Sequence, residues 1–423
     1  MRALYSLAWL LALPLVLTRL WWRGWREPGY RQHVLERLAL TPCKPAPGSA
    51  PLLWVHAVSV GETRAAEPLI DALLAAFPSH EILLTHMTPT GRATGAALFG
   101  KYGRRVRQAY LPYDLGVSVR RFLRIFRPRL CILMETEIWP NLMAACWHQQ
   151  IPVALVNARL SQRSLGRAHR LGRLIEDAAR QLRCVGAQTE TDAARIRSLG
   201  VANVHVTGSL KFDVTPPLQA LRAGAQLRQQ IGPRPVLLCA STREGEEAMI
   251  IAAIAQIGLP AATLLLLVPR HPQRFDQVAA LVEASGLRLQ RRSTLGTAPV
   301  DADVLLGDSM DEMFAYCAAC DVAMVGGSLL PLGGQNPIEP CVLGKPVMFG
   351  LHTFNFSEIC DAAIASGAAL RVEDAVAMVR AAAALLADPA SSSAMGRRAA
   401  AFAQLHGGAT VHTMDLLRSL ITA

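Results

Sequence analysis

Short runs of apolar residues alternate along this chain with longer segments that have helical spacing. In the first half, the apolar runs predict strands at residues 52–58, 81–85, 130–134, 153–157, 184–187 and 204–207. The segments between them have the spacing of helices, for example at residues 91–99, 115–126 and 140–149. Strands that alternate with helices in this way predict a doubly wound α/β fold built on a parallel sheet.

The alternation stops near residue 214 and then starts again. Residues 214–232 contain two consecutive prolines and little strand character, so we expect a linker there. The apolar runs that follow predict strands at residues 236–240, 263–268, 304–307, 322–325 and 346–349, and an Ala-rich stretch predicts a helix at 374–386. We therefore expect two Rossmann-like domains, 27–213 and 233–423, that face a central cleft, the usual place for a ligand.

The first 26 residues differ from the rest of the chain. An almost entirely apolar run of about 18 residues is at the lower limit for a membrane span. Arginines and the tryptophans Trp21, Trp22 and Trp25 follow it, a combination typical of the membrane interface. Because bulky aromatics stand where a signal peptide needs small residues, we expect residues 1–26 to be a membrane anchor that spans or lies on the bilayer. The alternative is a buried first helix.

Composition narrows the class of protein and of partner. Hydrophobic residues make up 52% and charged residues 18%, as in a globular protein with a large core. The net charge of +11 favours an anionic partner such as acidic lipid, a phosphorylated substrate or nucleic acid. We expect no nucleic-acid partner, since aromatic residues are only 6% and no recognised module appears. No metal is expected, because the histidines have no paired-ligand spacing, no DxD-like pair stands out, and the CxxC at 317–320 lies in an Ala-rich helical run with no second pair.

The first predicted strand leads directly into a carboxylate. Ser59 and Gly61 are consistent with a tight turn, and residues 63–74 with a helix, which puts Glu62 at the carboxyl edge of the sheet. Open α/β folds bind their ligands at that edge. Glu62 is therefore either a helix-start residue that complements the macrodipole or a catalytic base. The sequence does not decide the direction in which the pKa of Glu62 is shifted, because a helix start lowers this pKa and a nearby carboxylate raises it.

Two more charged groups of the first half follow strands. Glu135 and Glu137 alternate along an expected extended segment, so their side chains would point to opposite sides. One would face the cleft, and the other would cap the helix that begins near Pro140. Lys211 follows the last strand of this half and is expected at the mouth of the cleft; the alternative is a solvated linker lysine.

The strand ends of the second half carry small and charged residues. Ser241 and Arg243 follow the first of these strands, at a potential anion site that also begins a helix. Arg270 and His271 end the next strand and form a natural clamp for phosphate. The loop at 307–313 has the same character. Several such loops in one half predict a nucleotide site.

A glycine-rich run at residues 326–334 follows another strand. Its four glycines would let backbone amides approach a bound anion closely. Pro337 fits the first turn of the helix that follows. Glu339, in the same turn, would accept hydrogen bonds from the two hydroxyls of a ribose.

Six blocks of the sequence resemble signature motifs of the bacterial 3-deoxy-D-manno-octulosonic acid (Kdo) transferases. They lie, in order, at residues 56–62, 134–140, 157–161, 208–213, 268–272 and 333–340. The resemblance extends from about Trp21 to the C-terminal helices. Two positions depart from it, since Arg243 and Gln335 stand where relatives commonly have His.

The resemblance implies a GT-B-type glycosyltransferase at the cytoplasmic face of the bacterial inner membrane. It would transfer Kdo, with inversion, from CMP-Kdo to lipid IVA, the lipid A precursor, in lipopolysaccharide biosynthesis, with no cofactor. It implies that Glu62 is the general base and that Glu135 and Lys211 support the transition state. The implied CMP-binding residues are Pro269, Arg270, Met310, Asp311, Glu312, Asn336, Pro337, Ile338 and Glu339. The possible supporting residues are Ser59, Gly61, Glu137, Ser241, Arg243, His271, Gly333 and Gly334.

Two other functions remain open from the sequence. A sugar-nucleotide epimerase or another GT-B transferase would share the two domains and the ribose-binding glutamate. A membrane scaffold that binds nucleotide without catalysis would bind CMP without turnover, although Glu62 with Lys211 counts against it. For a lipid acceptor in an anionic membrane, basic residues of the first half would supply an attractive surface. These are Arg92, Arg104, Arg105, Arg107, Arg120, Arg121, Arg124 and Arg127.

Overall fold

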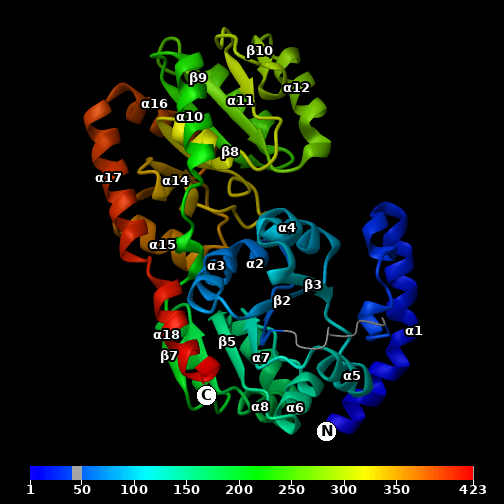
Figure 1. The fold of residues 1–423 in the computed structure, drawn as a ribbon. Helices are drawn as coiled ribbons and strands as arrows, with labels where there is room; N and C mark the ends of the chain where they lie inside the picture. The colour runs from blue at the N-terminus through cyan, green and yellow to red at the C-terminus, as the bar shows by residue number, and fades with distance from the viewer. Residues whose placement is uncertain (41–49, 423) are drawn as a thin grey trace. The chain divides into compact units, whose positions relative to one another are not determined.

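The computed structural model describes residues 1–40 and 50–422, which form two compact units. The first unit contains residues up to Val214 together with the end of the chain from Gly407, and the second runs from Thr215 to His406. Each unit is a seven-stranded parallel sheet covered by helices, so the predicted α/β class is confirmed (Figure 1).

The sheet of the first unit has the strand order β3-β2-β1-β4-β5-β6-β7. Its interior strands are continuous apolar runs and are buried on both faces, as expected in a parallel sheet. The strands are β1 (Leu52–His56), β2 (Glu81–His86), β3 (Val106–Tyr110), β4 (Leu130–Met134), β5 (Val153–Ala158), β6 (Cys184–Ala187) and β7 (Val204–Val206).

Helices cover both faces of this sheet. Apolar side chains of α5, α6, α8 and α9 pack on one face, and those of α2, α3 and α18 pack on the other. The helices of the unit are α1 (Arg2–Arg26), α2 (Val60–Ala65), α3 (Glu67–Ala76), α4 (Pro89–Phe99), α5 (Gly116–Phe126), α6 (Pro140–His148), α7 (Gln162–Leu171), α8 (Arg173–Ala179), α9 (Glu190–Arg197) and α18 (Ala409–Thr422).

The second unit repeats this plan with the order β10-β11-β9-β8-β12-β13-β14. Its strands are β8 (Val236–Thr242), β9 (Leu264–Pro269), β10 (Leu289–Arg291), β11 (Val304–Leu306), β12 (Val322–Val325), β13 (Val347–Phe349) and β14 (Ala369–Arg371). Its helices are α10 (Leu218–Ile231), α11 (Glu246–Ile257), α12 (Phe275–Ala284), α13 (Met313–Ala319), α14 (Ile338–Val342), α15 (Ser357–Ala365), α16 (Ala375–Ala387) and α17 (Pro389–Leu405).

Each sheet has a point where the strand order reverses. In the first unit the chain runs outward from β1 through β2 to β3 and then returns to lay β4 on the other side of β1. In the second unit β12 returns to the free side of β8 in the same way. Ligands of doubly wound folds bind beyond the carboxyl ends of the strands at such points. A ligand site is therefore expected at the loops that follow β1, β4, β8 and β12.

The structure differs from the expected domain division at both ends of the second domain. Most of the expected linker 214–232 is the helix α10, which packs on α13. The last helix, α18, leaves the second unit and packs on α3 of the first, where Met414, Leu417 and Ile421 are buried (Figure 1). Apolar positions on both helices explain the difference, because each buries a stripe against a neighbouring helix.

Three local predictions also need correction. The helix expected at 63–74 is two helices, α2 and α3, because Pro68 in the first turn of α3 has no amide to continue α2. Arg92 and Arg107, expected on a basic surface, instead form ion pairs with Glu36 and Glu81 at 2.6 and 2.9 Å.

Helix α1 is an unbroken helix of 25 residues that continues through Pro14. One side of it contacts the first unit: Ser6 Oγ donates to Asn141 Oδ1 at 3.1 Å, and the Trp9 ring stacks on Tyr113. Leucines on the other side are exposed. Most of the helix is not buried, so the alternative of a buried first helix is wrong. Among the described residues it is the one helix long and apolar enough to cross a membrane.

Candidate active site

Glu62 lies at the start of α2, directly beyond β1. Ser59 is the N-cap, and its hydroxyl accepts from the Glu62 amide at 3.5 Å, while the Glu62 carboxyl reaches back and accepts from the amide of Val58. This reciprocal pairing is a capping box. Gly61 is the second residue of the helix rather than part of a tight turn, as had been expected, and its φ is not positive. The helix-start interpretation of Glu62 is thus structurally correct, whether or not Glu62 also acts as a base.

The environment of Glu62 makes its carboxyl a weak acid. Burial raises the pKa of Glu62 to about 8, and the negative charges of Glu135 and, to a smaller extent, Glu137 act in the same direction. The amides of Val58 and Ser59 oppose the shift by stabilising the carboxylate. Burial and the neighbouring carboxylates raise the pKa of Glu62 more than the amides at the helix start lower it. The direction of the shift, which the sequence did not decide, is therefore upward. A carboxyl that titrates near neutral pH is suited to accept a proton.

Glu135 and Glu137 follow β4, next to β1 in the sheet. Glu135 has φ of 57°, so the segment is not extended as predicted, and its amide donates to the Val156 carbonyl at 3.0 Å. Glu137 accepts from the Trp139 indole at 2.6 Å, and burial raises the pKa of Glu137. Glu137 does not cap α6, again contrary to expectation.

Asp114, a residue that the sequence reasoning missed, caps α6 instead. Its carboxylate, fully buried, accepts from the amides of Asn141 and Leu142 at 2.9 and 2.8 Å. Asp114 lies in the loop that precedes α5, 27 positions before Asn141 in the chain. A cap from so distant a residue cannot be predicted from local sequence spacing.

Lys211 lies beside the carboxylates. Its Nζ is 3.4 Å from Glu135 Oε1, so it is not a solvated linker lysine. Asn157, at the end of β5, positions this lysine: its side-chain oxygen accepts from the Leu210 amide at 3.1 Å. Asp213, two residues after Lys211, accepts from the amides of Gly408 and Thr410 and so fixes the same turn to α18. Asn157 lies within a resembling block, but nothing in its type or spacing indicates this role.

Two buried histidines lie behind Glu62. His56 Nδ1 is 2.8 Å from Thr85 Oγ1, and His86 Nδ1 is 3.0 Å from the Ala57 carbonyl. Burial lowers the pKa of His56 to about 3 and that of His86 to about 4, so both are neutral at pH 7. They support the end of β1 without adding positive charge beside Glu62, whose own pKa therefore stays high.

In the second unit, basic groups gather beyond β8 and β9. Arg243 follows β8, and Arg270 and His271 follow β9, its neighbour. Burial and the charges of Arg243, Arg270 and Arg274 lower the pKa of His271. Neither Arg243 nor Arg270 has an acidic partner among the described residues, whereas Arg274 forms two hydrogen bonds with buried Glu247. The two unpaired guanidinium groups suit a phosphate.

The glycine-rich loop after β12 does not offer its amides to a ligand as expected. The carboxylate of Glu246, wholly buried, accepts from the backbone amides of residues 327–329 at 2.6 to 3.0 Å and from the backbone amide of Arg243 at 2.9 Å. The amide of Gly334 donates to the Gly327 carbonyl at 2.7 Å. Glu246 was missed as a site residue. It occupies the anion position of this loop and takes the backbone amides of the potential anion site after β8, while the Arg243 guanidinium has no acidic partner among the described residues.

Close packing explains why glycines are needed in that loop. Gly333 and Gly334 have φ of 93° and 75°, and a Cβ on Gly333 would lie 2.3 Å from the Asn355 side chain. Ser241 also has positive φ, at 55°, in an irregularity between β8 and β9. These residues shape the loops and do not themselves present chemistry.

The segment 336–339 begins α14. Pro337 was expected in the first turn of this helix. It is instead the N-cap, one position before the first helical residue. Asn336 accepts from the Ile338 amide at 3.1 Å, and its amide nitrogen donates to Glu339 Oε1 at 3.3 Å. Asn336 thus orients Glu339 at the helix start.

The loop after β11 holds the remaining candidates. Glu312 accepts from Arg292 at 2.9 Å and from the Ser309 hydroxyl. Asp311 has φ of 63°, and the Met310 side chain is about half exposed. Glu312 is therefore tied into the loop, while Met310 is open to contact. In the described part of the chain no three His, Cys, Asp or Glu side chains are grouped to hold a metal ion.

Comparison with known proteins identifies the family. The model of the family described as 3-Deoxy-D-manno-octulosonic-acid transferase (kdotransferase) matches residues 32–214. The 3-deoxy-D-manno-octulosonic acid transferase of Bordetella pertussis is 48% identical over 425 residues, which cover 98% of each chain. The enzyme of the same name from Haemophilus influenzae is 37% identical over 99% of this chain and 98% of its own.

A solved structure extends the comparison to the fold. UDP-GlcNAc 2-epimerase from Neisseria meningitidis matches 87% of this chain and all of its own with a TM-score of 0.60, at 16% identity. That likeness concerns the GT-B-like fold alone and does not make the chain an epimerase. Because nearly half of its residues are identical to the Bordetella enzyme over almost the whole length, the chain belongs to the 3-deoxy-D-manno-octulosonic acid transferases, glycosyltransferases of lipopolysaccharide biosynthesis.

Proposed function

We propose that the protein transfers Kdo from CMP-Kdo to lipid IVA with inversion, and that Glu62 is the general base. The observation that carries the proposal is the raised pKa of Glu62, at about 8, next to Glu135 and Lys211 at the reversal point of the first sheet. A structural capping residue alone needs no such environment.

The reaction assigns one role to each group. The hydroxyl oxygen of the acceptor attacks the anomeric carbon of Kdo as the bond to the CMP phosphate breaks. Glu62 takes the hydroxyl proton, so that no positive charge builds up on the attacking oxygen. A single displacement from the opposite face inverts the anomeric centre. Lys211 pairs with Glu135 beside Glu62, and this pair stabilises charge in the transition state.

The second unit provides for the leaving group. CMP departs as a phosphate monoester, and Arg270 and Arg243 lack acidic partners among the described residues, so their charge is available to it. Glu339 is the proposed acceptor for the ribose hydroxyls, held by Asn336. Met310 would contact the base or the sugar, and the other candidate residues shape the loops.

Helix α1 is the proposed anchor at the cytoplasmic face of the inner membrane. Its exposed leucines and tryptophans form a long apolar surface, which is more favourable in a bilayer than in water. The exposed arginines of α5, at 120, 121 and 124, and Arg127 directly after it would attract anionic lipid.

One experiment tests the reaction directly. The full chain is incubated with CMP-Kdo and lipid IVA, and the product is weighed by mass spectrometry. We expect lipid IVA heavier by one or more Kdo residues, and CMP released in equal number. CMP release without a heavier lipid would contradict the acceptor, and no reaction with CMP-Kdo would contradict the donor.

The anchor has its own test. Deletion of residues 1–26 should leave transfer to detergent-dispersed lipid IVA but abolish flotation with anionic vesicles. Full flotation of the truncated chain would contradict the anchor and leave the transfer reaction untouched.

A further inference from the structure

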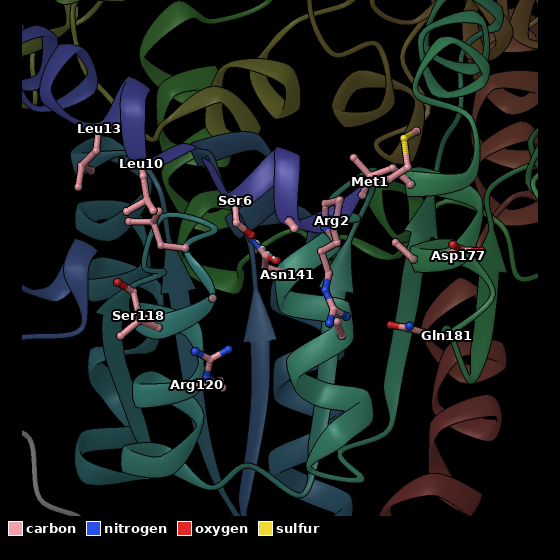
Figure 2. Close-up of a pocket in the computed structure, with 18 of the residues that line it drawn as sticks. Met1, Arg2, Ser6, Leu10, Leu13, Ser118, Arg120, Asn141, Asp177 and Gln181 are labelled. Atoms are coloured by element: carbon pink, nitrogen blue, oxygen red, sulfur yellow. Dashed lines mark hydrogen bonds between the residues drawn. The ribbon is translucent and has the colours of Figure 1, made fainter. Parts of the chain in front are cut away.

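A large cavity lies in the first unit between α1 and the helices α5, α6 and α8. Its volume is about 1150 Å³, above the range of about 300–1,000 Å³ typical of small-molecule sites. Leucines form much of its wall, including Leu10 and Leu13 of α1 and Leu38 and Leu40 of the segment that follows. Figure 2 shows Leu10 above Ser118 and Arg120, which lie on the first turns of α5. The cavity thus combines an apolar wall with a polar end.

One polar part of the lining is the N-terminus of α5; a second lies on α8 and directly after it, at Arg173, Asp177, Arg180 and Gln181. No side chain caps this helix, in contrast to α6, which Asp114 caps. Ser118 is only 9% exposed and lines the cavity, yet its hydroxyl has no hydrogen-bond partner among the described residues. The Ser118 oxygen is not among the polar atoms sealed from solvent without a partner, so the hydroxyl is open to the cavity and free to bond a ligand oxygen there. It is an observation independent of the free amides at the helix start.

Arg120 adds a charge that the protein itself does not balance. A Cβ on Gly116 would lie 3.3 Å from Arg120 Nη1, so the guanidinium lies against the first residue of α5. Arg120 is exposed, so water screens part of its repulsion from the positive end of the helix dipole, and a bound anion would offset the rest. In the part of the chain that the structure describes, Arg120 has no acidic partner. Asp177 also lines the cavity, but it is paired with Arg180 at 3.1 Å.

An amphipathic anion fits both ends of this cavity. We propose that it holds a bilayer glycerophospholipid, with the phosphate at the N-terminus of α5 between Ser118 and Arg120 and an acyl chain along α1. The free amides, the hydroxyl and the guanidinium would share the phosphate oxygens. The leucine wall would cover the chain. The lipid would then bind α1 to the unit across a space that protein side chains leave open.

The acceptor lipid is a less suitable occupant. The acceptor must bring a hydroxyl to Glu62, whose helix α2 packs on one face of the sheet, while α5, α6 and α8 pack on the other. A resident phospholipid has no such requirement. The inference rests on the proposed membrane association of α1, but it does not depend on the transfer reaction.

Lipid retention by the full chain in detergent tests the site. Native mass spectrometry is run with added phosphatidylglycerol, with diacylglycerol, which has no phosphate, and with inorganic phosphate. We expect one retained phosphatidylglycerol per chain, and diacylglycerol or phosphate retained at least about tenfold less. Ser118→Ala and Arg120→Gln should each lower retention about tenfold. The matched control Arg121→Gln removes the same charge one residue away, outside the cavity lining, and should retain lipid like the parent.

Specific results would overturn the proposal. Equal retention by Ser118→Ala, Arg120→Gln and the parent would exclude a phosphate site at α5. An equal loss in Arg121→Gln would mean general attraction to the basic helix. Displacement of phosphatidylglycerol by one equivalent of lipid IVA would make the cavity an acceptor site instead. Failure of the parent to float with vesicles would refute the anchor and this proposal together, whereas normal flotation with no retained lipid would refute the site alone.

Discussion

The ammonium group of Lys211 lies 3.4 Å from a carboxylate oxygen of Glu135, and each side chain is about one quarter exposed. Glu135 in turn is the largest charge that raises the pKa of Glu62. The lysine therefore reaches the proposed base only through Glu135: it contacts the Glu135 carboxylate, and the charge of Glu135 raises the pKa of Glu62. Because the three groups are in contact or interact through charge, substitutions of the carboxylates should change the rate of transfer and its pH dependence.

Replacement of the proposed base should abolish transfer but keep the fold. Glu62→Gln is expected to reduce kcat by about 10²- to 10⁴-fold, the usual contribution of general acid–base catalysis. The amide oxygen of glutamine can still accept from the Val58 amide, so the capping box should persist. Rates with CMP-Kdo and lipid IVA measure the effect, and calorimetry with CMP should give parent-like binding.

The matched control for this variant is Glu67→Gln. Glu67 is also in a first helical turn, that of α3, and burial raises its pKa as well. We expect its rate to stay within about twofold of the parent, since the residue has no proposed role. Near-normal transfer by Glu62→Gln would exclude Glu62 as the base.

The pH dependence of the reaction should report the Glu62 carboxyl. Because the base must be ionised, kcat/KM should rise with pH and level off above about 8, the pKa of Glu62. Glu135→Gln removes the larger neighbouring charge and should move this rise to lower pH, along with a lower maximum. Glu137→Gln should move it less, because Glu137 contributes the smaller charge effect. An unchanged midpoint in Glu135→Gln would contradict the coupling.

Most strands were predictable from the sequence, and the ones that were not share a physical reason. The strands β3, β10 and β14 were absent from the prediction, and all three are sheet edges. An edge strand is covered less and needs fewer apolar residues, as Arg107 and Gln108 in β3 illustrate. Interior strands such as β4 are continuous apolar runs and stand out. Burial on both faces thus makes the interior strands visible, although β7, also an edge strand, was predicted as well.

The candidate site was predictable in position but less so in detail. Residues that follow strands could be placed at the carboxyl edge from the alternation alone, as Glu62 and Arg270 were. The roles of the buried acceptors Asp114 and Glu246 could not be predicted, since each accepts from amides 27 or more positions away in the chain. Such pairings depend on the tertiary fold. Glu246 also shows that a glycine-rich loop can be satisfied by the protein's own carboxylate.

The stability of the protein should depend on pH through Glu62. Its pKa in the folded state, about 8, is above its ordinary value of 4.5, so folding favours the protonated form. The resulting stabilisation is complete below about pH 4.5 and is lost as the pH rises through 8. The glutamine side chain of Glu62→Gln is neutral at every pH, so the variant does not lose stability through this group as the pH rises. Its Tm relative to the parent should therefore increase from pH 5 to pH 8 in thermal melts; a constant difference would refute the raised pKa.

The unpaired arginines should carry CMP affinity. Arg270→Gln is expected to weaken CMP binding about tenfold or more, because a hydrogen bond to a charged group contributes about 1.5–3 kcal/mol. Isothermal titration calorimetry with CMP measures it. Arg222→Gln, an exposed position on α10, is the control and should bind like the parent. Equal affinity in Arg270→Gln and Arg222→Gln would show that Arg270 does not contact the nucleotide.

The buried carboxylate of Glu246 should hold the nucleotide loops in shape. Glu246→Gln turns one acceptor oxygen into a donor that faces backbone amides at 2.6 to 3.0 Å, and the unpaired groups should cost about 2–5 kcal/mol of unfolding free energy. Since Arg243 and residues 327–329 lose their common partner, CMP affinity should fall as well. Chemical denaturation and calorimetry measure the two effects. Glu244→Gln, exposed two residues earlier, should change neither. A Glu246→Gln variant with parent-like stability would mean that these amides find other partners, and the loop would then be open to an anionic ligand after all.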